Sequence, residues 1–234
     1  MNPAAPFDAR WISERHLRLA GPPLRDAAMI HACCAALRRA AIPGLVDLAA
    51  AHSSILIEFD FGAVDADDAA PEFAEAAALA ALRDIEQTAA PVGETIVIPV
   101  CFAPQFAPDL AESAARAQLS IDAFIGAFVS AAYAVRFLGF APGFAYLDGL
   151  PTPLATPRHD SPRPRVAAGS VGIAGNQTGI YPHDSPGGWQ LIGRTPLRMF
   201  NVDRPRAALL QAGDRMRFVV ISADEFDRMS REPA

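Results

Sequence analysis

The sequence A-G-S-V-G-I-A-G-N-Q-T-G-I-Y-P, residues 168–182, is the most informative segment in the second half of the chain. Glycines stand at positions 169, 172, 175 and 179, and no helical period of apolar residues runs through the segment. Glycine permits a positive φ angle, or the close approach of another backbone or a ligand. We therefore predict short strands joined by turns in this segment.

Short apolar segments separated by glycine and proline flank this stretch. After helices that begin near Asp109 and Ser120, we predict strands at 133–140, 170–174, 189–192, 197–200 and 216–221. Asp109 and Glu112 have the spacing of a capping box, which predicts that Asp109 caps the first of these helices. Many short strands with such punctuation favour a β-barrel or a β-sandwich.

The first half of the chain alternates strands and helices. Strands are predicted at 11–19, 45–48, 53–61 and 95–100, with one helix at 26–39 and a second that starts near Asp68 and carries Pro71 in its first turn. The order β-α-β-β-α-β is typical of a ferredoxin-like domain, in which two helices pack on an antiparallel sheet. We predict an α+β protein with a ferredoxin-like domain at 1–95 and a β-barrel domain at 96–234.

Length and composition indicate an ordinary globular protein. The 234 residues are 51% apolar and 20% charged, and the net charge is -6. This charge argues against a nucleic-acid or anionic membrane surface, because either needs a clustered basic face. No apolar run is long enough to span a bilayer, and the N-terminus lacks a secretory signal pattern. We expect a cytoplasmic protein without nucleic-acid or membrane partners.

Cysteine and histidine do not form a metal-binding pattern. Cys33 and Cys34 lie on a predicted helix, Cys101 is distant from them in sequence, and the five histidines are scattered. No His-Glu-x-x-His motif or Cys/His cluster occurs. We expect no metal site.

The polar residues interleaved with the glycines form the candidate site. Amide and hydroxyl groups can orient a small polar ligand, and arginines can hold a carboxylate or phosphate with two hydrogen bonds. No Gly-Lys-[Ser/Thr] motif follows the glycines, so we expect ATP, if used, to be bound mainly by another protein of an assembly. The candidate catalytic residues are His183, Gln177 and Arg194, and the candidate substrate-binding residues are Arg158, Asn176, Thr178, Tyr181, Ser185 and Gln190.

Several of these residues also have a structural interpretation. His183-Asp184-Ser185 contains the residue types of a hydrolase triad, but adjacency in sequence is not triad geometry, and a serine before Pro-Gly-Gly suits a turn. Gln177 and Thr178 either orient a ligand or hydrogen-bond the barrel's own loops, since buried polar groups need partners in both cases.

The arginines and aromatic residues have two interpretations as well. Arg158 and Arg194 either bind an anion or pair with acidic residues or a partner chain. Phe140, Phe144 and Tyr146 lie on a loop rich in glycine and proline, where they either line a pocket mouth or seal a partner interface.

Three motifs resemble those of one protein family. They are F-L-G-F-A-P-G-F-A-Y-L (137–147), the run at 168–182, and S-P-G-G-W-Q-L-I-G-R-T-P (185–196). With weaker similarity at 42–48 and 53–60, most of the chain is similar to the family that includes the B component of 5-oxoprolinase, allophanate hydrolase subunit 1 and the sporulation kinase inhibitor KipI. Fused versions form the carboxyltransferase part of urea carboxylase. The resemblance implies a ferredoxin-like domain followed by a cyclophilin-like β-barrel.

The resemblance also implies an activity shared among several chains. In 5-oxoprolinases of this type, two barrel subunits and a third protein open the lactam of 5-oxoproline to glutamate at the expense of ATP. The expected partners are therefore a larger cyclophilin-like subunit and a third subunit, and the chain is expected to be inactive alone. The alternatives are an inhibitor of a sensor histidine kinase and a subunit of a urea- or allophanate-metabolising assembly.

The chain departs from the family pattern in the helix before Tyr133, where a histidine is usual and Phe128 stands here. If that histidine has a chemical role, the activity or the substrate differs in this chain. If it only packs the helix against the barrel, phenylalanine can replace it.

Overall fold

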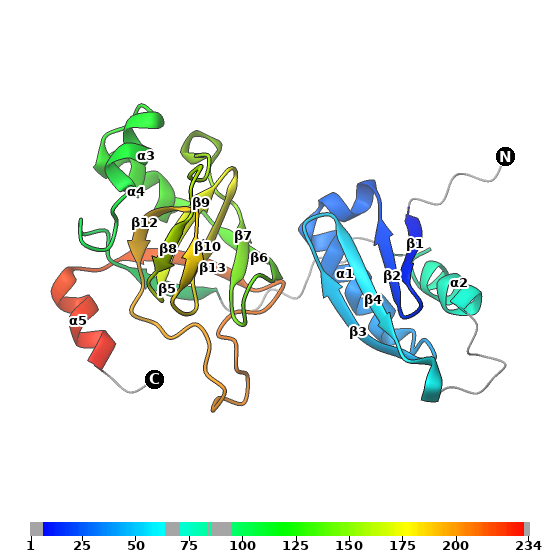
Figure 1. The fold of residues 1–234 in the computed structure, drawn as a ribbon. Coiled ribbons are helices and arrows are strands. Elements are labelled where there is room, and N and C mark those ends of the chain that lie inside the picture. Colours follow the sequence, from blue (N-terminus) through cyan, green and yellow to red (C-terminus); the bar gives the residue numbers. More distant parts are fainter. Residues whose placement is uncertain (1–6, 64–70, 84, 86–94, 232–234) are drawn as a thin grey trace. The chain divides into compact units, whose positions relative to one another are not determined.

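The computed structural model describes residues 7–63, 71–83, 85 and 95–231. The chain forms two compact units, Met1–Val92 and Gly93–Ala234, each with its own hydrophobic core. Figure 1 shows an N-terminal unit of sheet and helices and a C-terminal unit built mainly of strands. The predicted α+β class, with a small sheet domain before a barrel, is confirmed.

The N-terminal unit contains a four-stranded antiparallel sheet in the order β1-β2-β4-β3. Its strands are β1 (Asp8–Ser13), β2 (His16–Ala20), β3 (Leu45–Ala50) and β4 (Ser54–Phe59). In β4 every second side chain is buried, Ile55, Ile57 and Phe59, so one face of the sheet belongs to the core. The predicted single opening strand at 11–19 is instead a hairpin, because the chain reverses at Glu14 and Arg15.

Two helices supply the other side of this core, α1 (Ala27–Arg39) and α2 (Pro71–Ala81). Asp26 caps α1 by accepting hydrogen bonds from the backbone N–H groups of Ala28 and Met29. Cys33 and Cys34 are buried on the inner face of α1 as free thiols. Burial raises the pKa of Cys33 to about 12, which keeps it protonated and unreactive. The start predicted for α2 near Asp68 lies outside the described residues.

The C-terminal unit is a seven-stranded sheet in the order β12-β9-β10-β7-β6-β13-β5. A short two-stranded ribbon, β8 with β11, accompanies it. The strands are β5 (Ile96–Val100), β6 (Tyr133–Leu138), β7 (Ala145–Asp148), β8 (Arg163–Val166), β9 (Ser170–Ala174), β10 (Gln177–Ile180), β11 (Ser185–Gly187), β12 (Gln190–Arg194) and β13 (Arg215–Val220).

The two edge strands of this sheet meet and nearly close a barrel. The backbone N–H of Cys101 donates to the carbonyl of Arg194 at 2.8 Å, and the N–H of Arg194 donates to the carbonyl of Cys101 at 3.0 Å. Strand β5 is therefore part of the barrel, where it pairs in parallel with β13, and not the closing strand of the N-terminal sheet. The strand predicted at 197–200 is also absent, since only Phe200 bridges to Ala208 in this described stretch.

Helices α3 (Leu110–Arg116) and α4 (Ile121–Ser130) cover the barrel beside β12 and β13. Phe128 of α4 is fully buried, and its ring lies 4.8 Å from that of Phe218 and 5.4 Å from that of Tyr133. The Tyr133 hydroxyl donates to the Phe128 carbonyl oxygen at 2.9 Å. Phe128 therefore packs the helix against the barrel, the second of the two roles considered for this position.

A last helix, α5 (Ala223–Arg231), follows β13. Phe226 on α5 packs against Phe106 with ring centroids 4.2 Å apart, which attaches the helix to the barrel unit. No helix in the described part of the chain is both long and apolar enough to cross a membrane.

Candidate functional site

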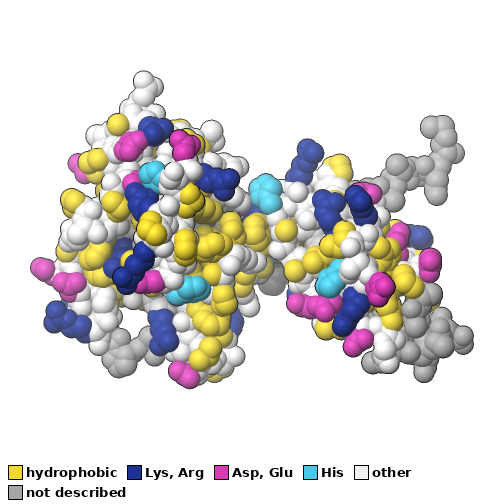
Figure 2. Space-filling view, in the orientation of Figure 1, with side chains coloured by type: hydrophobic (Ala, Val, Ile, Leu, Met, Phe, Trp, Pro, Cys, Tyr) yellow, Lys and Arg dark blue, Asp and Glu magenta, His cyan; other side chains and the backbone are white. Residues whose placement is uncertain are grey.

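A cleft of about 490 Å³ opens on the barrel unit between the β6–β7 loop and the β8–β11 ribbon. This size suits a small molecule. Figure 2 shows hydrophobic side chains gathered over one face of this unit, with basic and histidine side chains among them. The cleft is lined by Phe140, Phe144, Tyr146, Arg158, His159, Asp160, Pro162, Tyr181, Pro186, Gly187, Gly188 and Trp189.

One wall of the cleft is a cluster of aromatic rings. The Phe144 ring stands edge-on to Tyr181 at 5.3 Å and to Trp189 at 5.5 Å, and Tyr146 lies 4.9 Å from Phe144. Phe140 extends this wall to the surface, where it is 62% exposed. Burial raises the pKa of both Tyr146 and Tyr181, so both phenols stay neutral at physiological pH.

The glycines of the quoted motifs make room for this wall. A β-carbon on Gly179 would lie 2.9 Å from the Phe144 ring, and one on Gly187 would lie 2.8 Å from the Tyr181 ring and closer still to its hydroxyl oxygen. Neither position can hold a side chain unless an aromatic ring moves. The glycines are predicted to permit the close approach of another group. At these two positions, that group is an aromatic ring of the protein itself.

A second part of the cleft lining, the polar wall around His159, is supported by one buried carboxylate, Asp109, which is not itself a lining residue. Arg163 Nη2 donates to Asp109 Oδ1 at 2.6 Å, and the backbone N–H of Leu191 donates to Oδ2 at 2.6 Å. Asp109 precedes α3 but makes no side-chain capping bond, so the predicted capping box is wrong. The carboxylate instead connects α3, β8 and β12.

His159 joins this wall from the loop before β8. Its Nε2 lies 3.3 Å from Asp109 Oδ2, in a geometry that falls short of a hydrogen bond, and this buried nitrogen has no other partner among the described residues. The backbone N–H of His159 donates to the Gly188 carbonyl at 2.7 Å, which fixes the loop beside Gly188. The imidazole is 28% exposed and lines the cleft.

Two of the residues predicted to bind substrate line the cleft. Arg158 is exposed at its edge, and Tyr181 is buried in its aromatic wall. Gln190 is buried next to the lining residue Trp189 in sequence, and its Nε2 donates to the Pro157 carbonyl at 2.9 Å. Ser185 starts β11 beside the lining residue Pro186, and its buried hydroxyl has no partner in the described chain.

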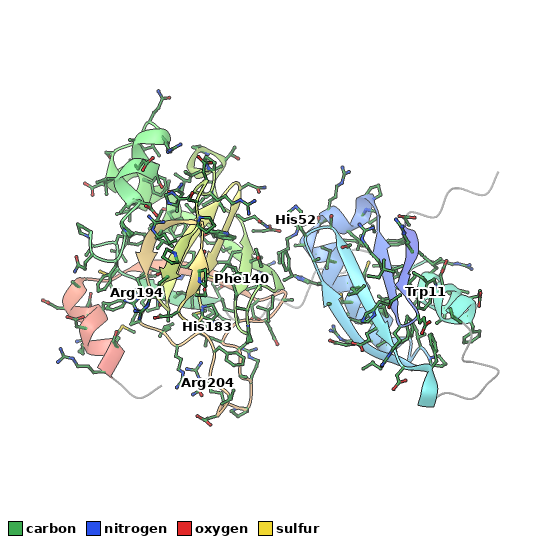
Figure 3. All side chains as sticks on the ribbon, viewed as in Figure 1. Trp11, His52, Phe140, His183, Arg194 and Arg204 are labelled. Carbon is green, nitrogen blue, oxygen red and sulfur yellow. The ribbon has the colours of Figure 1, made fainter. Side chains whose placement is uncertain are left out.

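The structure places the other predicted residues elsewhere on the barrel. The Thr178 hydroxyl is buried and donates to the Gly172 carbonyl at 2.8 Å, while Asn176 and half-buried Gln177 lie at the β9–β10 turn. Arg194 Nε donates to the Ala168 carbonyl at 2.7 Å. The Arg194 guanidinium lies over the Phe226 ring at 5.7 Å, next to α5 (Figure 3).

His183 is exposed on the loop after β10, outside the cleft lining. Its neighbour Asp184 points away to other partners, because it accepts hydrogen bonds from the Ala168 backbone N–H at 2.9 Å and from Arg165 Nε at 2.8 Å. These two bonds lower the pKa of Asp184. His183, Asp184 and Ser185 therefore do not form a triad.

Sequence reasoning misses the two residues that give the cleft its polar wall. In the sequence His159 is one of several scattered histidines, and the spacing of Asp109 indicates a helix cap. They are 50 positions apart, so no local spacing connects them. The available signal is the segment P-R-H-D-S-P-R-P-R (157–165), in which prolines and ionisable residues are concentrated. No group of three His, Cys, Asp or Glu residues in the described chain is arranged to hold a metal ion.

Comparison with known proteins shows which family the chain belongs to. The family model described as carboxyltransferase domain, subdomain C and D, matches residues 9–210. The chain belongs to this family. It is 39% identical to the B component of 5-oxoprolinase from Bacillus subtilis (strain 168) over 211 residues, which cover 87% of each chain. It is 58% identical to the B component of 5-oxoprolinase from Escherichia coli O157:H7 over 90 residues, 38% of this chain and 41% of that one.

Solved structures show the same architecture. The crystal structure of TTHA0988 superposes with a TM-score of 0.75 at 35% identity, over 89% of this chain and 41% of that longer chain. The structure of PH0987 from Pyrococcus horikoshii matches with a TM-score of 0.56 at 35% identity, over 94% of this chain and 100% of that one. The resemblance to the B component of 5-oxoprolinase is confirmed by the sequence matches, and the chain is a homologue of that protein.

Proposed function

We propose that this chain is the B component of an ATP-dependent 5-oxoprolinase and that its barrel cleft forms part of the site where the lactam is opened. The observation that supports this most is the 39% identity to such a component over 87% of both chains. This coverage extends over both units and includes the segments that build the cleft. Both relatives are named as one subunit of 5-oxoprolinase, which supports the proposal that this chain acts as part of a multi-subunit assembly.

The chemistry of the cleft suits 5-oxoproline. This molecule is a flat five-membered lactam that carries one carboxylate. Tyr146 and Trp189 offer aromatic surface to a flat ring, and the exposed guanidinium of Arg158 at the cleft edge can pair with a carboxylate. The amide itself needs donors and acceptors, which the polar wall around His159 supplies.

The other parts of the reaction belong to partner proteins in this proposal. An amide is a poor electrophile, and transfer of a phosphoryl group from ATP to its oxygen creates a leaving group. No phosphate-binding glycine loop occurs in this sequence, so we assign ATP to a third subunit and a second wall of the site to a larger cyclophilin-like subunit. The exposed ring of Phe140 beside the cleft is suited to contact that larger subunit.

Reconstitution from purified components tests the proposal. The chain is mixed with the larger cyclophilin-like protein and the third protein of the same organism, and glutamate and ADP are measured after addition of 5-oxoproline and ATP. We expect turnover only when all three proteins are present. Full activity without this chain would refute the proposal, and turnover of urea or allophanate in place of 5-oxoproline would assign a different substrate.

A further inference from the structure

Several buried polar atoms in and beside the polar wall of the cleft have no hydrogen-bond partner in the described chain. Among the described residues, Arg163 Nη1, Ser185 Oγ and Gln190 Oε1 are buried without a hydrogen-bond partner, and His159 Nε2 faces the Asp109 carboxylate at 3.3 Å without the geometry of a hydrogen bond. Each belongs to a residue that lines the cleft or directly adjoins a lining residue in sequence. Buried polar atoms in native proteins are nearly always paired, so these atoms can form hydrogen bonds with a ligand or with water at the wall.

His159 is the group in this cluster that can transfer protons. Its Nε2 faces the Asp109 carboxylate at 3.3 Å, while Nδ1 makes no hydrogen bond with the described residues. An imidazole with one nitrogen directed at a carboxylate and the other available to a ligand has the arrangement of an acid–base pair. The hydrogen-bond distance within such a pair is often long in the absence of substrate and shortens when substrate binds.

Asp109 is fixed independently of the histidine. Arg163 and the Leu191 backbone N–H hold its two oxygens, and the Asp109 backbone N–H donates to the Leu191 carbonyl at 3.0 Å. The carboxylate cannot turn away without breaking these bonds, so it presents a fixed acceptor to His159. The charged and titratable groups around the imidazole are Asp109, Arg158, Asp160, Arg163, Tyr146 and Tyr181.

We propose that His159 is the acid–base residue of the cleft and that Asp109 is its positioning residue; this inference rests on the proposed function. His159 Nδ1 takes a proton from water as the water oxygen bonds to the activated lactam carbon. The same nitrogen then gives a proton to the lactam nitrogen as the carbon–nitrogen bond breaks. Water thus adds across that bond, and the phosphorylated carbonyl remains as an acyl phosphate, from which a second water molecule releases inorganic phosphate to leave glutamate. The imidazole returns to its starting state while Nε2–H stays directed at Asp109.

The test uses the complete three-protein assembly. Wild-type activity with 5-oxoproline comes first, because its absence refutes the proposed function and not this inference. His159→Ala is then expected to lower kcat by about 10²- to 10⁴-fold, the usual contribution of a general acid or base, with a much smaller change in KM. The matched control is His16→Ala, a histidine on β2 of the other unit, which is expected to leave kcat unchanged.

Two measurements separate proton transfer from a structural role. Added imidazole is expected to restore part of the rate of His159→Ala in a saturable way and to do nothing to His16→Ala. In addition, His159→Asn is expected to lose the limb of the pH–rate profile that reports the base. A wild-type rate in His159→Ala, or a rate loss that imidazole does not rescue with an unchanged pH profile, would overturn the role of His159.

The role of Asp109 is tested by a double-mutant cycle. Asp109→Asn keeps an oxygen to accept the Leu191 N–H, and the double variant with His159→Ala is expected to lose no more rate than His159→Ala alone, because the two residues act as a unit. If the fold-loss in rate of the double variant equals the product of the two single losses, Asp109 acts independently of His159. If Asp109→Asn does not fold, the imidazole rescue still decides the main claim. A large loss in His183→Ala with none in His159→Ala would transfer the role to His183 and overturn the inference.

Discussion

A β-carbon added to Gly187 would lie 2.8 Å from the ring of Tyr181 and still closer to its hydroxyl oxygen, an approach that such atoms do not make. The Tyr181 ring is almost fully buried and belongs to the aromatic wall of the cleft, where it contacts Phe144. Glycine at 187 is therefore required by the position of the ring, and the shape of the cleft depends on it. At Gly188, the next residue, an added β-carbon would have no neighbour closer than 3.6 Å.

This pair of glycines provides a first prediction. Gly187→Ala is expected to displace the Tyr181 ring, to lower the free energy of unfolding by about 1–3 kcal/mol, as overpacking does, and to raise KM for the ligand of the cleft. Gly188→Ala is expected to change the free energy of unfolding and KM only slightly. Thermal unfolding and steady-state kinetics measure the two effects, and equal behaviour of the two variants would contradict the account of the cleft.

Phe128 provides a second prediction, because it packs α4 against the barrel. Its ring is fully buried between Phe218 and Tyr133, so Phe128→Ala is expected to cost about 3–5 kcal/mol of stability. The matched control is Phe140→Ala, whose exposed ring is expected to matter by no more than about 0.5 kcal/mol. Denaturant titration measures both. A small loss from Phe128→Ala would remove the packing explanation.

Arg194 provides a third prediction, because its contacts lead to α5 and not to the cleft. The Nε–Ala168 hydrogen bond and the position of the guanidinium over the Phe106 and Phe226 rings attach the last helix. Arg194→Ala is expected to increase hydrogen exchange in α5, whereas Arg198→Ala, which removes an exposed side chain, is expected not to. Unchanged hydrogen exchange in α5 together with a raised KM would show that Arg194 binds the ligand and does not attach α5.

Asp184 provides a fourth prediction, on pH. The Ala168 N–H and Arg165 lower its pKa in the folded state, so the charged form stabilises the fold at pH values above the unfolded pKa. This contribution is lost as the pH falls through the depressed folded value. The melting temperature of wild type is therefore expected to exceed that of Asp184→Asn at neutral pH, and the two are expected to converge under acid conditions. A constant difference across the pH range would contradict the pKa assignment.

Much of the architecture can be predicted from the sequence because local patterns determine it. Strand β4, helix α1 and the glycine-spaced strand β9 each appear near the predicted positions. The fold class and the family resemblance are confirmed. Local patterns do not indicate that β5 pairs with β13, because these strands are more than a hundred residues apart and only the closure of the barrel brings them together.

The site is harder to predict for the same reason. Residues in and beside the glycine motif are candidates because they are polar and close in sequence, but neighbours on a strand point to opposite faces. Thr178 faces the interior, Asn176 lies at a turn, and Arg194 reaches α5. The polar wall instead combines Asp109 and His159 from distant segments. Their proximity is a property of the folded barrel.

Arg158 offers the most direct test of the claim that the cleft receives substrate. In the three-protein assembly, Arg158→Ala is compared with Arg198→Ala, which removes an exposed arginine away from the cleft lining. Loss of a charged hydrogen bond to a substrate carboxylate is expected to raise KM for 5-oxoproline by about tenfold or more, equivalent to at least about 1.4 kcal/mol. The Arg198 variant is expected to keep the wild-type KM. Equal KM values for the two variants would contradict the claim.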